Sequence, residues 1–234
     1  MIRLDKFLCE MEIGTRSQVK DMVKKGMVSI DGEVTKKADY KFDETAAKVC
    51  VNGKELSYQK FYYYMLNKPQ GVVSATTDNH DKTVLDLLKD ASGKDLFPVG
   101  RLDKDTEGLI LITNDGELSH NLLSPKKHVD KTYLMETKMP VTEDMVLKLV
   151  QGVDIGEEKL TLPAKVRQLE DRKIELTITE GKFHQVKRML KAVGNEVVYL
   201  KRLSMGSLKL DETLELGKYR SLTEKEIADL KREK

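Results

Sequence analysis

The stretch from Gly108 to Asp115, GLILITND, constrains the fold of this 234-residue chain more than any other. Its centre is apolar at consecutive positions rather than at alternate ones, which is typical of a strand buried in the interior of a sheet. Around it, predicted strands and helices follow one another without a strict β–α–β alternation. The sequence therefore predicts an α+β fold built on a mixed, largely antiparallel sheet with flanking helices.

The patterning after residue 60 supplies the other elements of this sheet. Predicted helices have apolar residues at helical spacing, and one of them begins after Asp115, a residue suited to cap it. Predicted strands cover FYYYMLNKPQGVV up to Pro69, then 97–103, 131–139, 163–170, 173–180 and 196–210, and predicted helices cover 83–90, 116–124, 141–153, 184–194 and 223–234.

The first fifty residues have a different organisation. Residues 1–24 predict two short helices, which Gly14 separates and of which the second is capped by Thr15 or Ser17. A hairpin turning at Asp31-Gly32 and a short strand over 47–53 follow. The polar stretch 54–60 reads as a linker, so we expect two domains, 1–57 and 58–234.

Several basic side chains gather on the two short helices. They are Arg3, Lys6, Arg16, Lys20 and Lys24. Basic helices can contact phosphates, and such contacts fix position without reading sequence. The alternative is a solvated charged face, because acidic residues dilute the positive charge of the same helices. The net charge of +2 does not decide between the two.

The pattern RLDKFL followed by TRSQVKDMVKKGMVSIDGEV resembles an S4 (αL-type) domain over roughly the first fifty residues. This resemblance implies binding to structured RNA.

Asp103 is the candidate catalytic residue of the larger domain. It follows a predicted strand, stands two residues after Arg101 and precedes a polar loop. A nearby guanidinium favours the ionised carboxylate, which is the state that a nucleophile or a base requires. An aspartate that merely braces a loop is the alternative that these residues leave open.

The segment GRLDKDTEGLILITNDG is similar to the signature of the pseudouridine synthases, and within them to the RsuA branch, whose members modify ribosomal RNA. MLNKPQGVVS, KTYLME and EGKFHQVKRML match three further segments of that family in order and spacing. The resemblance covers nearly the whole chain after residue 60.

The resemblance implies a role for each matched residue. Asp103 corresponds to the family's essential aspartate, which works without a cofactor or a metal. Tyr133 would stack on the flipped target base, Lys182 would pair with Asp103, and Arg101 would sit near the extruded nucleotide. The resemblance also implies RNA contacts in the segment EGKFHQVKRML and in the strand after it, at His184, Lys187, Arg188 and Arg202.

Other chemistries find little support in the sequence. No apolar run is long enough to span a membrane, and the charged N-terminus lacks the apolar centre of a signal peptide, so we expect a cytoplasmic protein. The four histidines and two cysteines lack the spacing of metal ligands, and no metal is expected.

Three functions remain to be weighed. The matched segments and the short C-terminal end are most similar to enzymes that act on 16S ribosomal RNA, with an assembling small-subunit particle as a further possible substrate. One alternative is a synthase that modifies 23S RNA. Another is a non-catalytic S4-type ribosome-assembly factor, but such a protein has no need of Asp103, Tyr133 and Lys182 together. The resemblance also implies a monomer.

Overall fold

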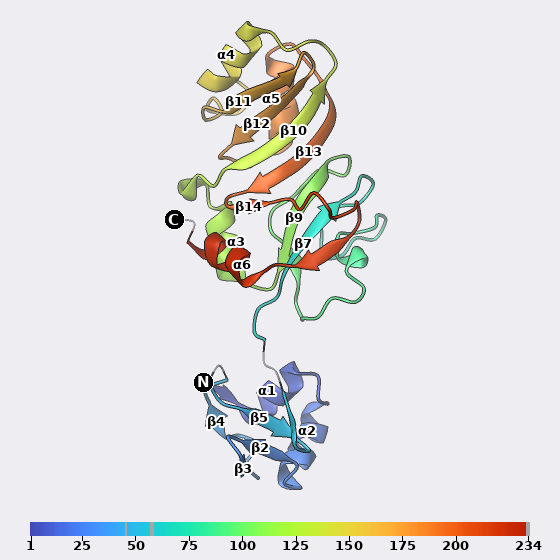
Figure 1. Ribbon diagram of the computed structural model, residues 1–234, viewed down its shortest axis with the longest axis vertical. Helices are drawn as coiled ribbons and strands as arrows, with labels where there is room; N and C mark the ends of the chain where they lie inside the picture. Colours follow the sequence, from blue (N-terminus) through green and yellow to red (C-terminus); the bar gives the residue numbers. More distant parts are fainter. Residues whose placement is uncertain (45, 57–58, 233–234) are drawn as a thin grey trace. The chain divides into compact units, whose positions relative to one another are not determined.

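The computed structural model describes residues 1–44, 46–56 and 59–232, and the chain divides into two compact units, Met1–Lys60 and Phe61–Lys234. Each unit has its own buried core (Figure 1). The predicted boundary between residues 57 and 58 lies outside the described residues. Among the residues described, no helix is both long and apolar enough to cross a membrane.

The smaller unit packs two helices against short strands, in the order β1 (Ile2–Arg3), α1 (Leu4–Glu10), α2 (Arg16–Lys24), β2 (Val28–Ile30), β3 (Glu33–Val34), β4 (Lys41–Phe42), β5 (Val49–Val51) and β6 (Lys54–Glu55). The strands form a sheet of order β3-β2-β5-β6 and a separate β1-β4 pair. Thr15 caps α2 in a capping box with Gln18, as one of the two predicted caps. The predicted linker is wrong at its start, because Lys54–Glu55 pairs with β5.

The larger unit contains the predicted mixed sheet. Its order is β11-β12-β10-β13-β9-β7-β15, with β14 beside β13 and β8 beside β9. The strands are β7 (Tyr63–Lys68), β8 (Phe97–Pro98), β9 (Glu107–Thr113), β10 (Lys131–Thr137), β11 (Lys165–Glu170), β12 (Lys173–Ile178), β13 (Val197–Met205), β14 (Leu208–Lys209) and β15 (Tyr219–Ser221). The helices are α3 (Gly116–Leu123), α4 (Glu143–Gln151), α5 (Gln185–Ala192) and α6 (Glu224–Lys231), with short 3₁₀ turns at Leu85–Leu87 and Pro125–Lys127.

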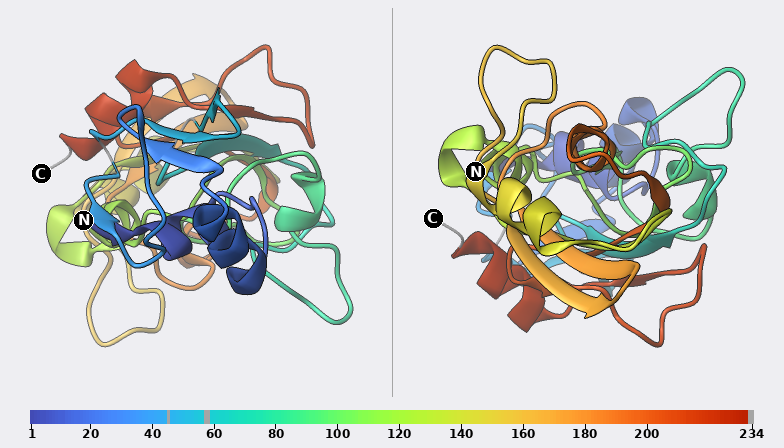
Figure 2. Two further views of the ribbon diagram at one scale, coloured as in Figure 1. Left: turned by 90° about the horizontal axis from the view of Figure 1, so that it is seen from below. Right: turned by 90° about the horizontal axis from the view of Figure 1, so that it is seen from above.

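Strand β9 is buried on both faces, which explains its uninterrupted apolar run. Leu109 and Leu111 pack with residues of α3 and α6. Ile110 and Ile112 belong to the other core, which also contains residues of α4 and α5. Helix α4 lies against β11, at the edge of the sheet opposite β15 (Figures 1 and 2).

A short parallel contact joins the two halves of the sheet. All other strand pairs of this sheet are antiparallel, but β9 and β13 run parallel and pair only through Glu107 with Lys201 and Gly108 with Arg202. A β-carbon on Gly108 would overlap the backbone of Arg202, and Gly108 has a φ of +101°. Glycine is therefore required where the two half-sheets meet.

Three predicted elements differ from the structure. The helix over 83–90 is only the 3₁₀ turn, because the backbone leaves the helical region at Leu88, with a φ of −97° and a ψ of +45°. The strand over 97–103 ends at Pro98, and Gly100, with a φ of +74°, turns the chain shortly afterwards. The strand over 196–210 is divided into β13 and β14 by a turn at Gly206.

Candidate active site

Asp103 lies in the loop between β8 and β9, and the segment after β7 holds that loop in place. Ser74 Oγ donates a hydrogen bond to the Leu102 carbonyl oxygen and accepts one from the Leu102 nitrogen, at 2.9 and 3.0 Å. The backbone nitrogen of Gly71 donates to the carbonyl oxygen of Lys104. The segment after β7 and the loop that carries Asp103 thus fold against each other.

Lys68, the last residue of β7, ties the same loop from inside. Its side chain is fully buried, and Nζ donates to the carbonyl oxygens of Asp103 at 3.0 Å and of Thr106 at 2.8 Å. Burial lowers the pKa of Lys68 to about 8, against the attraction of Asp105 and Asp103. A buried ammonium satisfied by backbone carbonyls fixes the path of the loop.

The cation that pairs with Asp103 comes from α5. Lys187 Nζ lies 3.0 Å from Oδ2 of Asp103 and 2.5 Å from Oδ1 of Asp105. Burial by itself lowers the pKa of Lys187, but hydrogen bonds and attraction from Asp105 and Asp103 outweigh it and raise the net pKa. The hydrogen bond from Lys187 is the main reason that the pKa of Asp105 is lowered.

The predicted pairing of Asp103 with Lys182 is wrong. Lys182 Nζ instead lies 3.5 Å from Oε1 of Glu180, in the segment before α5. Lys187 belongs to the same segment, EGKFHQVKRML, so the sequence contained both lysines but no signal that separates them. His184 Nε2 does lie 3.5 Å from Oδ1 of Asp103.

Phe183, which is not among the predicted site residues, lies against His184. Phe183 is 68% exposed, and its ring stacks on the His184 imidazole with centroids 3.8 Å apart. His184 has a φ of +48°, in the left-handed region. Phe183 and His184 both line the cavity described next.

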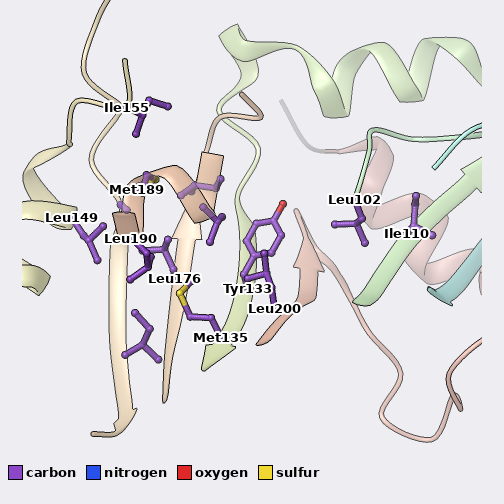
Figure 3. Close-up of a cluster of buried hydrophobic side chains, with 14 of the residues drawn as sticks. Leu102, Ile110, Tyr133, Met135, Leu149, Ile155, Leu176, Met189, Leu190 and Leu200 are labelled. Carbon is purple, nitrogen blue, oxygen red and sulfur yellow. The ribbon is translucent and has the colours of Figure 1, made fainter. Parts of the chain in front are cut away.

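Asp103, Tyr133, Arg101 and Lys182 line a single open cavity of about 950 Å³. A smaller pocket of about 70 Å³ shares these four residues in its lining and also includes Lys187. Tyr133 lies on β10 and is only 8% exposed, in the core cluster of Figure 3, where its ring is drawn near Leu200. The cavity is large enough for a nucleotide, and its lining combines apolar residues with charged groups.

The remaining predicted RNA contacts have different environments. Arg188 is held by its own domain, because its guanidinium donates to Glu157 and to the carbonyl oxygens of Phe183 and Ile155. Arg202 is buried beside Tyr133 and lines the cavity. Within the described ranges, no group of three or more histidine, cysteine or carboxylate side chains could hold a metal ion.

In the smaller unit, the predicted phosphate contacts divide into two groups. Arg3 makes a two-pronged contact with the buried Asp5, and Lys6 pairs with Glu10 at 3.6 Å. Arg16, Lys20 and Lys24 are all exposed along α2, four residues apart, so they share one face of that helix.

Comparison with known proteins places these features in context. A family model described as RNA pseudouridylate synthase matches residues 62–192, and one for the S4 domain matches residues 2–47. The chain is 51% identical, over 97% of both chains, to a Bacillus subtilis protein named as an uncharacterized RNA pseudouridine synthase, YtzG. It is 43% identical to the ribosomal small subunit pseudouridine synthase A of Vibrio cholerae, over 98% of this chain and 99% of the relative.

A solved structure shows the same fold. The crystal structure of a pseudouridylate synthase superposes with a TM-score of 0.70 at 40% identity, covering 98% of this chain and all of the other. The similarity includes both the smaller unit and the larger one.

Proposed function

This chain belongs to the RNA pseudouridylate synthase family and carries an S4 domain, and from that premise we propose that it converts one uridine of 16S ribosomal RNA to pseudouridine with Asp103 as the catalytic carboxylate. The 16S assignment is supported by relatives at 41–43% identity whose printed names are ribosomal small subunit pseudouridine synthase A. The observation that carries the assignment of Asp103 is its place in the lining of the small pocket, which Tyr133 shares, with Lys187 Nζ 3.0 Å from its carboxylate.

The substrate uridine must leave its stack before this cavity can hold it. Extruding a base costs a few kcal/mol, which contacts in the cavity have to offset. Tyr133 would stack on the extruded base, a contact that typically contributes about 1–3 kcal/mol. Arg101 is exposed at the cavity and would hold the strand beside the gap.

The reaction exchanges one bond of the base for another. The bond from the ribose C1′ to N1 breaks, a bond from C1′ to C5 forms, the C5 hydrogen leaves as a proton, and N1 is protonated. Atoms and electrons therefore balance without an oxidant or a reductant. Lys187 Nζ lies 3.0 Å from the Asp103 carboxylate and would orient it, as either a nucleophile or a base requires.

The smaller unit would bring the enzyme to folded RNA. The exposed row of Arg16, Lys20 and Lys24 on α2 is suited to phosphate contacts, because its cations are spaced along one helix face. Such contacts would position the RNA, while the cavity of the larger unit selects the uridine.

The test uses 16S RNA transcribed in vitro, incubated with the protein and no cofactor. Pseudouridine is mapped by carbodiimide labelling and primer extension, with Asp103→Asn in parallel. One new stop that is absent with the variant would support the reaction, the substrate and the role of Asp103. A stop on 23S RNA alone would reassign the substrate. No stop on either RNA, free or in assembling particles, would contradict the proposal and favour a binding factor.

A further inference from the structure

Two cations lie buried beside Tyr133, and the reaction outlined above does not use them. Lys131 is two residues before Tyr133 on β10, and Arg202 is the residue of β13 that pairs with Tyr133. Lys131 is 6% exposed and Arg202 is 2% exposed, yet both line the 950 Å³ cavity.

Neither cation has a counterion within the described part of the chain. The guanidinium of Arg202 donates through Nε to the carbonyl oxygen of Leu109 at 2.8 Å, while Nη2 is buried without a hydrogen-bond partner. Lys131 Nζ donates to the carbonyl oxygen of Val129 at 3.0 Å. The neighbouring carboxylate of Asp130 is paired at 2.8 Å with Lys165 instead.

The other carboxylates of the cavity are also engaged elsewhere. Glu180 accepts from the backbone nitrogen of Leu162 and from the Gln185 amide. Asp78 accepts from the backbone nitrogens of His80 and Asp81. Asp103 is paired with Lys187. The charge of Lys131 and Arg202 is therefore not balanced by the protein groups around the cavity.

Uncompensated buried charges are rare because desolvation opposes them. Here the pKa of Lys131 is lowered to about 8, mainly by burial and also by the charge of Arg202, against the attraction of Asp130. A bound anion would offset the repulsion between two like charges that are held together in a cavity. Guanidinium and ammonium groups are the usual protein partners of a phosphate.

We propose that Lys131 and Arg202 form a subsite for a backbone phosphodiester of the RNA, next to the extruded uridine. This inference rests on the proposed function, because Tyr133 would hold the base and Arg202 pairs with Tyr133 across the strands. A phosphate is joined to its base through a single ribose, so a base on Tyr133 brings its flanking phosphates to this part of the cavity. The subsite recognises the strand and not the base sequence.

The first experiment compares Lys131→Met with Lys138→Met. Methionine keeps the length of the buried stem without its charge, and Lys138 is an exposed lysine just beyond the end of β10, paired with Glu196. Binding of a 16S RNA fragment is measured at several KCl concentrations. In Lys131→Met, we expect about tenfold weaker binding at low salt and a slope of log K against log salt that is smaller by about 0.7–0.9, the loss of one phosphate contact. Lys138→Met should change neither.

Thermal unfolding separates this role from a structural one. Removing an uncompensated buried charge should leave the melting temperature of Lys131→Met equal to that of the wild type or raise it. A lysine that merely braces the fold would give a lower melting temperature with an unchanged salt slope, and that result would overturn the proposal.

A second measurement needs neither RNA nor turnover, so it stays informative if the proposed function fails. The ε-carbon signal of Lys131 in ¹³C-lysine-labelled wild type, assigned with Lys131→Met, is titrated with pH in chloride and in inorganic phosphate at equal ionic strength. Phosphate in the subsite should move the midpoint upward by about half a pH unit or more, since an anion favours the charged amine. An unchanged midpoint would overturn the proposal. If the wild type forms no pseudouridine, but the salt slope and the phosphate-dependent midpoint both behave as expected, only the proposed function is contradicted.

Discussion

Lys187 Nζ lies 3.0 Å from the carboxylate of Asp103 and 2.5 Å from that of Asp105, so one ammonium from α5 joins two acidic residues of the loop before β9. This contact connects the segment EGKFHQVKRML to the segment that bears the candidate catalytic residue. The Lys187 side chain is only 27% exposed, so solvent screens the contact incompletely.

We expect Lys187, and not Lys182, to be the lysine that supports the catalytic role of Asp103. Replacing Lys187 by Met removes the charge that holds the Asp103 carboxylate, and we expect the single-turnover rate of pseudouridine formation to fall about 100-fold or more. Lys182→Met is the matched control from the same segment, and it should cost less than about fivefold, because Lys182 contacts Glu180. Rates that fall equally in the two variants would show that the Lys187 contact is not the important one.

The second prediction concerns the anchor of the loop. Lys68→Met leaves the carbonyl oxygens of Asp103 and Thr106 without their buried donor, which should lower the free energy of unfolding by about 2–4 kcal/mol. Lys104→Met, in the loop itself, breaks only a half-exposed ion pair with Asp81 and should cost less than about 1 kcal/mol. Urea unfolding of the two variants measures the difference, and similar losses would argue against the anchor.

The third prediction concerns the seam between the half-sheets. Gly108→Ala places a β-carbon against the backbone of Arg202 at a positive φ, and it should destabilise the fold by at least about 2 kcal/mol. Gly116→Ala is the matched control, since nothing lies within 4 Å of its added β-carbon and it opens helix α3. That control should be neutral or should stabilise by up to about 1 kcal/mol. Melting temperatures that change equally would remove the special status of Gly108.

The fourth prediction concerns pH. Lys68 and Lys131 have pKa values near 8 in the folded protein and near 10.5 when unfolded. Between these values the unfolded chain binds more protons, so the free energy of unfolding should rise with pH. The penalty for each buried charge is fully present below pH 8 and is relieved above it.

We expect a gain of roughly 1.5 kcal/mol per lysine between pH 8.0 and 9.5. Urea unfolding at the two pH values measures it, and Lys131→Met should show about half of the wild-type gain. The range stops at 9.5 because burial raises the pKa of Tyr63 and Tyr199, whose titration on unfolding opposes the gain near pH 10. Stability that is flat or falling across this range would contradict the predicted charge state.

The local patterns were sufficient for most of the fold. The apolar run of β9 predicted a strand buried on both faces, and Thr15 and Asp115 cap helices that their positions indicated. The mixed, largely antiparallel sheet is confirmed. These features depend on neighbouring residues along the chain, which a sequence displays directly.

The ends of elements were less accessible. The backbone leaves the helical region at Leu88, after a single turn, and Gly206 divides a strand whose apolar pattern continues. Both are local changes of backbone conformation, and the pattern of apolar residues does not reveal them.

The sequence by itself determined the family, the two-part organisation and the set of segments that meet around Asp103. Only the tertiary structure decided which charges touch. Lys182 and Lys187 stand in one motif, but Lys182 precedes α5 and contacts Glu180, whereas Lys187 lies on α5 and contacts Asp103. The absence of a counterion for Arg202 among the described residues likewise depends on packing between strands distant in sequence. Charge pairing is a matter of a few ångströms between side chains, and a one-dimensional pattern does not contain that distance.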